Sequence, residues 1–454
     1  MKLDSLALIN FRRFKTLEVD FHPELTVLGA KNGQGKTTVL DAATIALGTF
    51  VGAFDLGKSK SINQKDVRFH RAPNQTESEQ VFPTRVEARL SMLSGPVIRE
   101  LTGAKGKTTI KDAAELTRLG RTLMEQVRSL QPVDLPLMAY YGSGRLWNAH
   151  KNMSRKAVLS ESRTMGYEDC FSAASSFTQV QQWMSKATLA ALQQQNLDPD
   201  RGHYIAGQIQ GIQRAVDSVL SVEGWEGFHY SVQHEELAIG HPTIGALPVS
   251  LLSDGVRAMV SLVADMAWRC VKLNPHMGEE AARLTAGIAF IDEVDMHLHP
   301  QWQQRVIGTL RDAFPRIQLV VTTHSPQVLS TVDAESIRLL RHEFDPENGE
   351  TVSQAVRPLM QSRGVASSDV MADLQEVDPV PRVQEAQWLV EYKALVTSME
   401  QGQDLEERMQ VLKSKIIDHF GENHSVWLEC QRLERLQEMK SRLGRGKPFQ
   451  PVNR

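Results

Sequence analysis

A run of residues from Ala30 to Thr38 carries the glycines, the lysine and the hydroxyls that phosphate binding requires. It matches the pattern GxxxxGK[ST], except that alanine takes the first glycine position and Gly29 stands one residue earlier. Glycines let main-chain N–H groups surround a phosphate, and the lysine adds positive charge toward the β- and γ-phosphates. The predicted ATP-binding residues of this run are Ala30, Lys31, Asn32, Gly33, Gln34, Gly35, Lys36, Thr37 and Thr38.

The segments on either side of this loop have the character that positions such a site. Leu25–Leu28 reads as a strand and Thr38–Leu47 as a helix, so the loop lies between strand and helix and faces the positive end of the helix. Gly106–Thr109 also reads GKTT, but Leu101 occupies the first glycine position and no strand precedes it. We therefore predict that this second stretch is a surface loop.

An acidic pair, Asp292 and Glu293, follows the apolar run Ala286–Ile291, which is typical of a buried parallel strand. At the carboxyl end of such a strand, Asp292 would hold Mg²⁺ together with Thr37, and Glu293 would polarise the attacking water. The same residues could instead cap a following helix. The phosphate loop upstream favours the interpretation of Glu293 as a catalytic residue.

Two further motifs flank this strand in the chain. The stretch from Leu252 to Arg257 resembles the LSGGQ signature of ABC ATPases, and we predict that Ser253 and Gly255 bind the γ-phosphate of a nucleotide held by a facing subunit. A plain helix cap is the alternative. His324 follows the apolar run Ile317–Thr322 and is similar to the switch histidine of these enzymes, so we assign it a catalytic role.

Longer stretches narrow the resemblance to a family. Ile9–Phe14 and Asp292–Pro300 resemble RecF- and OLD-type ATPases. The stretches that resemble the ATPase subunit of Septu-type anti-phage systems (PtuA), whose relatives accompany some retrons, are Tyr140–Trp147, Ser162–Tyr167, Gly364–Val370 and Val377–Pro379. The likeness extends over essentially the whole chain. His297 and His299 lie within Asp292–Pro300. We interpret them as part of a helix start and not as metal ligands, since no further metal ligand follows at a useful spacing.

The resemblance implies a set of cofactors and partners. It implies ATP and Mg²⁺ as cofactors, a homo-oligomer with composite ATP sites, and an HNH-type nuclease subunit (PtuB-like). Nucleic acid, in the form of retron non-coding RNA or msDNA, is a further candidate partner. OLD-type relatives carry a nuclease domain after the switch histidine, but no glutamate followed by a strand-borne DxD comes after His324 here. We therefore predict no nuclease activity in this chain.

Two more residues are candidates for the nucleotide site. Arg145 follows the turn from Gly142 to Gly144, where its guanidinium could reach a phosphate or tie the loop to a carboxylate. Gln64, in the loop before Asp66, is a candidate for the glutamine that many ABC-type sites place near the metal.

The expected fold is α/β: an ABC/SMC-like P-loop ATPase head with a helical insertion and a C-terminal helical appendage. We expect an N-terminal lobe over 1–150, a mainly helical insertion over 151–235, a C-terminal lobe over 236–357 and the appendage over 358–454. Leu93–Gln131 is expected to be mostly helical. Helices are predicted, from composition and periodicity, over Phe171–Leu197, Ile205–Leu220, Val383–Val396, Leu405–Phe420 and Val426–Leu443.

Composition sets outer limits on function. The 454 residues are 41% hydrophobic and 23% charged with a net charge of −3, which is typical of a globular protein without an overall basic field. Cys170, Cys270 and Cys430 lie far apart, so we expect reduced thiols. The chain start has no apolar core of the signal-peptide kind and no long apolar stretch occurs, so we expect a cytoplasmic protein without a membrane partner.

Two functions remain open from the sequence. The first is a defence ATPase that senses and controls a nuclease subunit. The second is a RecF/SMC-like DNA repair or chromosome-maintenance ATPase that binds DNA directly. A transporter ATPase does not fit the RecF-like start of the chain. The helices predicted after residue 383 are amphipathic and mixed in charge, which favours docking to a partner over clamping DNA.

Overall fold

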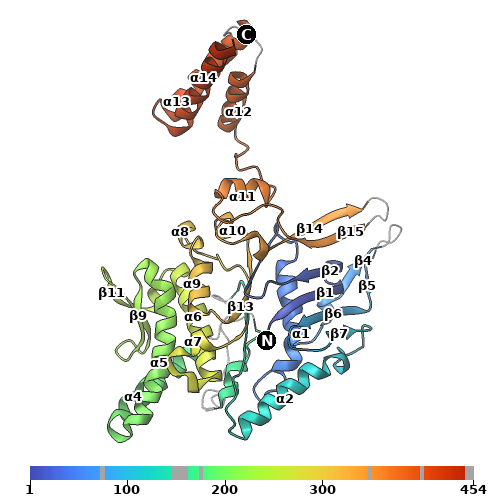
Figure 1. Cartoon of the computed structure of the whole chain (residues 1–454), viewed down its shortest axis with the longest axis vertical. Helices are drawn as coiled ribbons and strands as arrows, with labels where there is room; N and C mark the ends of the chain where they lie inside the picture. Colours follow the sequence, from blue (N-terminus) through green and yellow to red (C-terminus); the bar gives the residue numbers. More distant parts are fainter. Residues whose placement is uncertain (72–76, 145–161, 173–176, 346–349, 399–402, 445–454) are drawn as a thin grey trace, which may run out of the picture. The chain divides into compact units, whose positions relative to one another are not determined.

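The structure is a computed structural model of the whole chain, and it describes all residues except 72–76, 145–161, 173–176, 346–349, 399–402 and 445–454. It divides into two compact units, Met1–Gln375 and Glu376–Arg454 (Figure 1). Within the described residues, no helix is both long enough and apolar enough to span a bilayer.

A six-stranded sheet forms the centre of unit 1, in the order β15-β14-β3-β13-β12-β8. β3, β13, β12 and β8 are parallel, β14 continues parallel to β3, and β15 closes the edge antiparallel. Every residue of the four central strands is buried, because both faces of the sheet are covered. The bounds are β3 Leu25–Gly29, β8 Leu137–Tyr141, β12 Gly287–Ile291, β13 Ile317–Thr323, β14 Ile337–Asp345 and β15 Glu350–Val356.

A second, antiparallel sheet has the order β2-β1-β6-β7. Its strands are β1 Leu3–Phe11, β2 Phe14–Asp20, β6 Thr84–Leu90 and β7 Val97–Leu101. Helix α1, Lys36–Val51, contacts both sheets, and all of its residues except Thr37 and Asp41 are buried. Those two polar residues are therefore the part of α1 that keeps exposed surface, while Lys36 and Thr38 at its start are buried.

The predicted mostly helical character of 93–131 is wrong for its first part, which contains β7. Helix α2, Ala114–Arg128, begins only after a loop. In β7, Val97, Arg99 and Leu101 are buried in alternation, which is the two-residue period of a strand. Arg99 is buried because its guanidinium donates to the carbonyls of Thr109 and Ile45, so a charged residue stands at an inward-facing position.

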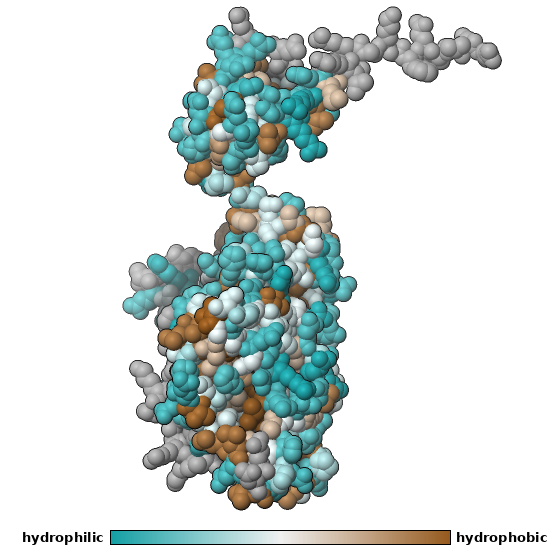
Figure 2. Space-filling model, turned by 90° about the vertical axis from the view of Figure 1, so that its left-hand side faces the viewer, coloured by the Kyte–Doolittle hydropathy of each residue, from teal (hydrophilic) through white to brown (hydrophobic). Residues whose placement is uncertain are grey.

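Two long helices, α4 Phe177–Leu197 and α5 Pro199–Leu220, pack against each other, and α5 also packs on α6, Asp254–Leu273. The predicted break between the two helices is confirmed: the carboxylate of Asp198 accepts from the N–H of Arg201, and Pro199 occupies the first turn. The insertion is not wholly helical, because β9 Glu226–Ser231 pairs with β10 Glu236–His241, and β10 with β11 Gly245–Pro248. Figure 2 shows polar and apolar patches on this side of the unit.

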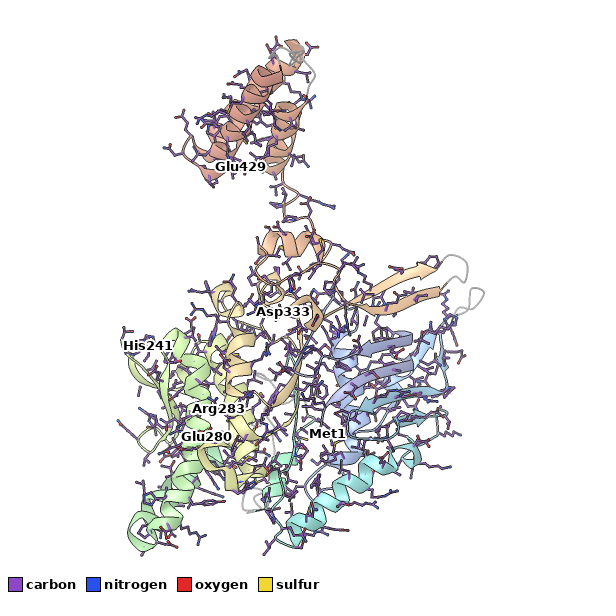
Figure 3. All side chains as sticks on the ribbon, in the orientation of Figure 1. Met1, His241, Glu280, Arg283, Asp333 and Glu429 are labelled. Carbon is purple, nitrogen blue, oxygen red and sulfur yellow. The ribbon has the colours of Figure 1, made fainter. Side chains whose placement is uncertain are left out.

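The remaining α-helices and strands in the described part of unit 1 are short, and single 3-10 turns lie between several elements. These short helices and strands are β4 Arg68–His70, β5 Glu79–Val81, α7 Ala281–Leu284, α8 Pro300–Gln303, α9 Val306–Ala313, α10 Pro326–Leu329 and α11 Ser367–Asp373. The appendage was expected to start at residue 358, yet residues up to 375 belong to the head. Val370 is buried in the core of unit 1, and Arg363 pairs with Asp333, the acidic residue labelled in Figure 3, at 3.2 Å.

In the described part of unit 2, the chain forms the helices α12 Gln384–Thr397, α13 Gln403–Phe420 and α14 Ser425–Gly444, close to the predicted ranges. They surround a small core of their own, made of Tyr392, Leu412, Ile416, Trp427 and Cys430. The three cysteines of the chain are buried free thiols.

Candidate nucleotide-binding site

A cavity of about 280 Å³ lies at the carboxyl ends of β3, β12 and β13, where ligands of parallel sheets bind. Its walls come from the loop after β3, the turn between β1 and β2, and the residues that follow β12 and β13. The lining residues are Arg12, Arg13, Asn32, Gly33, Gln34, Gly35, Lys36, Thr37, Thr38, Asp292, Glu293 and His324.

Two glycines give the loop a conformation that other residues adopt poorly. Gly33 and Gly35 have φ of +73° and +98°, in the left-handed region. A Cβ on Gly35 would also lie 2.4 Å from the ring of Phe14. Ala30 is tolerated in place of the usual first glycine, and its carbonyl accepts a hydrogen bond from Nζ of Lys36 at 3.0 Å. The main chain at Ala30 therefore helps to hold the lysine at the cavity.

Lys36 and His324 meet directly in this cavity. Nζ of Lys36 donates to the imidazole of His324, which brings together two residues far apart in the chain. Burial lowers the pKa of Lys36 to about 8, although Asp292, Glu293 and Asp295 oppose the shift. Burial, and then the charge of Lys36, lowers the pKa of His324 below its usual value. The histidine is therefore neutral at physiological pH and able to accept this hydrogen bond.

The acidic end of β12 is held by two hydroxyls. Asp292 is only 2% exposed; its carboxylate accepts from Thr37 Oγ1 at 2.9 Å and from Thr322 Oγ1 at 2.7 Å. The N–H of Glu293 donates to the same Thr322 hydroxyl at 2.8 Å, and Glu293 adopts a φ of +49° as its chain turns along the cavity. Thr322 thus fixes both acidic residues relative to β13.

The pair Thr37 and Asp292 fits Mg²⁺, which prefers hydroxyl and carboxylate oxygens. Across the described ranges, no group of three or more histidines, cysteines, aspartates and glutamates is placed to hold a metal ion. The phosphates of a bound nucleotide and water would therefore have to complete the coordination of Mg²⁺ here, as is usual for phosphate-transfer sites.

The signature residues lie apart from the cavity of their own chain. Ser253 is exposed and precedes α6, and its side chain makes no capping hydrogen bond, so the plain cap considered above is not formed. Gly255 is buried, and a Cβ there would lie 2.5 Å from the carbonyl oxygen of His297. Neither residue lines the cavity around Lys36. His299 caps α8 by accepting from the N–H of Gln301, which confirms the predicted helix start.

The structure does not place Gln64 at the cavity. Gln64 is exposed, and its side-chain amide donates to the carbonyl of Ala104, because the residue lies on the outer side of a 3-10 turn. Asp66, in the same turn, is the residue that supports the site, through Arg12. Arg145 lies outside the described residues.

Sequence reasoning assigned no role to Arg12 and Arg13, although both line the cavity. Arg12 donates to Asp41 at 2.8 Å and to Asp66 at 2.8 and 3.0 Å, and Arg13 donates to the carbonyl of Gly33. Burial acts to lower the pKa of Arg12, but Asp41 and Asp66 raise it above its usual value. Both arginines lie in the RecF-like stretch Ile9–Phe14, which was the sequence feature that could have indicated their role.

His342 on β14 holds the phosphate loop from another direction. Its Nε2 lies 2.9 Å from the carbonyl of Gln34, its Nδ1 lies 2.8 Å from Ser353 Oγ, and its ring stacks on Phe14 at 5.8 Å between centroids. The loop is therefore braced by a strand hundreds of residues away, a contact that no local pattern indicates.

This fold and site define a P-loop ATPase head of the ABC/SMC-like class with a helical insertion and a separate C-terminal helical unit, as predicted. Residues 31–330 match the family described as AAA domain, putative AbiEii toxin, Type IV TA system, and the chain belongs to this family.

Curated relatives agree with the predicted resemblance. Retron Vc95 probable ATPase of Vibrio cholerae is 23% identical over 94% of this chain and 88% of its own length. Retron Ec83 probable ATPase of Escherichia coli is 37% identical over 41% of this chain, a match that spans only 32% of that relative. Septu protein PtuA of Bacillus mycoides is 34% identical over 28% of this chain and 18% of its own length. The resemblance to retron- and Septu-type ATPases is thereby confirmed.

Among solved structures, the SMC head domain from Thermotoga maritima superimposes with a TM-score of 0.40 and 16% identity. The match covers 79% of this chain and 99% of that one.

Proposed function

We propose that this chain binds and hydrolyses ATP in a site completed by a second copy, and that it is the regulatory ATPase of a retron- or Septu-type anti-phage complex. The observation that carries the ATPase part is the convergence of Lys36, Thr37, Asp292, Glu293 and His324 on one cavity. In the defence complex it would control an HNH-type nuclease subunit, and its relatives named as retron and Septu proteins support this role.

These five residues of the cavity each have a definable part in hydrolysis. Lys36 places its charge on the β- and γ-phosphates, and the amides at the start of α1 surround them. Thr37 and Asp292 would hold Mg²⁺, which when bound would neutralise phosphate charge. Glu293 orients and polarises the attacking water, because its carboxylate follows β12 directly into the cavity. His324, at the end of β13, would contact the γ-phosphate beside Lys36.

A second copy would complete the site through Ser253 and Gly255. Ser253 is exposed outside its own cavity, and the neighbouring Leu251 is 69% exposed, which is unusual for a leucine beside a polar loop. An apolar side chain next to a free helix start suits burial against a partner head. In that arrangement the hydroxyl of Ser253 and the amides of α6 would contact the γ-phosphate held by Lys36 of the other copy.

A hydrogen bond supports communication from the nucleotide to the C-terminal unit. Gln375 is the last residue of unit 1, and its side-chain amide donates to the main-chain carbonyl of His324 at 2.9 Å. Val370 and Leu374, just before it, are buried in the head. A displacement of His324 by a γ-phosphate would therefore reach the residue at which the chain leaves the head.

Co-expression with a candidate HNH-type nuclease subunit tests the proposal. Lys36→Ala should abolish ATP binding and the protection of cells against phage, while the complex with the nuclease still forms. Gln375→Ala should retain ATP hydrolysis and weaken protection. The matched change Gln80→Ala, which removes one side-chain amide donor to the main-chain carbonyl of Gln64 away from the cavity, should leave both hydrolysis and protection unchanged. Protection by Lys36→Ala would refute the proposed control by ATP, and DNA-stimulated hydrolysis without any nuclease partner would favour a repair ATPase.

A further inference from the structure

Tyr141, the last residue of β8, is bonded to the two parts of the head that carry the catalytic motifs. Its main-chain carbonyl accepts from the N–H of Asp292 at 2.8 Å, directly at the acidic end of β12. Its hydroxyl donates to Oδ2 of Asp265 at 2.7 Å, on the signature helix α6. One residue therefore joins the end of β12 to the helix that begins next to Ser253.

The carboxylate that receives this hydroxyl belongs to a buried ion pair. Nε of Arg269 donates to the same Oδ2 of Asp265 at 2.8 Å, and both side chains are 2% exposed. Arg269 also donates through Nη1 to the carbonyls of Gly166 and Glu168, at 2.7 and 3.1 Å. These bonds connect α6 to the segment around Gly166 and Glu168, which packs beside β8.

The buried cluster of Tyr141, Asp265 and Arg269 is not needed to pack α6 against the head. The residues around it on α6 are apolar and fully buried, among them Val263, Met266 and Val271, so the helix has ample hydrophobic contact without a charged pair. Buried charges are costly to desolvate, and their geometry is directional, so they determine one placement of an element rather than add bulk stability. Tyr141 extends that directional contact across to the strand that ends at Asp292.

The geometry points to Tyr141 as a positioning residue for ATP hydrolysis, which sets the signature helix at a fixed place relative to the acidic end of β12. The inference rests on the composite site proposed above, in which α6 of one copy acts on the nucleotide of the other. Gly255, packed on the carbonyl of His297, gives the same two parts a second close contact. In a dimer, Tyr141 of each copy would keep Ser253 and the acidic end of β12 at a fixed distance from each other, so that both composite sites could form together.

The hydroxyl acts as a donor and not as a reacting group. Tyr141 is buried and does not line the cavity around Lys36. Burial, and then the charge of Asp265, raises the pKa of Tyr141 well above its usual value, so the hydroxyl keeps its proton throughout the range in which the protein would work.

Tyr141→Phe in the full chain removes this donor and nothing else. Tyr167→Phe is the matched control, because Tyr167 is also buried and its hydroxyl donates a hydrogen bond to the carbonyl of Pro136 at 2.8 Å. Three quantities are compared with the wild type: the Kd for ATP, kcat at saturating ATP over a range of protein concentrations, and self-association of the same variants carrying Glu293→Gln.

For Tyr141→Phe we expect a Kd for ATP within about twofold of wild type, a fall in kcat of about tenfold, and weaker self-association. Tyr167→Phe should lower thermal stability to a similar degree and leave kcat unchanged. An unchanged kcat for Tyr141→Phe, or an equal loss in both variants, would overturn the inference while leaving the composite site in place. ATP hydrolysis at the wild-type rate by a chain shown to be monomeric under the assay conditions would overturn the composite site and, with it, this inference.

Discussion

The charge of Lys36 makes ATP affinity depend on pH in a way that ordinary lysines do not show. The unliganded site lowers the pKa of this lysine to about 8, because burial outweighs the nearby carboxylates. Binding a triphosphate requires the charged form. Affinity should therefore be greatest below pH 8 and should fall as the pH rises through that value, since each neutral lysine must first take up a proton.

The magnitude follows from the fraction of charged lysine. With a pKa of about 8, Lys36 is about three quarters charged at pH 7.5 and about one thirtieth charged at pH 9.5. The Kd for Mg²⁺–ATP should therefore rise about 20- to 30-fold between these two values. A lysine with its ordinary pKa would change affinity by only about 10% over the same range. His324, with its lowered pKa, stays neutral throughout and adds nothing to the change.

Titration of the purified chain with a fluorescent ATP analogue at constant ionic strength measures this profile. Lys36→Arg is the matched control, because a guanidinium keeps its charge at every pH used. The Arg variant can bind more weakly, but its profile should be flat between pH 7.5 and 9.5. A flat profile for the wild type, or the same fall for Lys36→Arg, would refute the reasoning.

Three further outcomes are expected. Glu293→Gln should bind ATP normally and hydrolyse it at least about 10²-fold more slowly in single-turnover assays. Unchanged turnover would mean that another residue activates the water. Mixing inactive Lys36→Ala with inactive Ser253→Arg should restore part of the hydrolysis, because each mixed dimer retains one intact site; no recovery in proven mixed dimers would indicate a self-contained site. Deleting residues 383–454 should leave hydrolysis near normal and abolish co-purification with the nuclease, and a truncated chain that still bound the nuclease would place docking on the head.

Several features were readable from the sequence because they are local. The phosphate loop combines glycines, a lysine and hydroxyls within a few residues, and the apolar runs before it and before Asp292 are long enough to indicate buried strands. The three C-terminal helices were predicted close to their bounds for the same reason, since their helical composition is local, and α13 and α14 also have an amphipathic period. The break at Asp198 and Pro199 depended on cap chemistry within one turn.

Other expectations failed where a distant contact changes the meaning of a residue. β7 was misread because Arg99 occupies an inward position, which the carbonyls of Thr109 and Ile45 make possible. The head extends to Gln375 and not to residue 357, because the segment after β15 returns to pack on α10. Gln64 was placed near the metal by its position in the chain, yet the fold turns it outward.

The sequence by itself thus determined the class of site and most of the groups that act on a phosphate, because those groups follow one another within single loops. Only the tertiary structure decided how they are held: Arg12 between Asp41 and Asp66, His342 on the loop, and Tyr141 between Asp292 and α6. These contacts join residues from separate elements, and their partners are selected by the packing of whole sheets and helices. Local periodicity contains no information about such pairings.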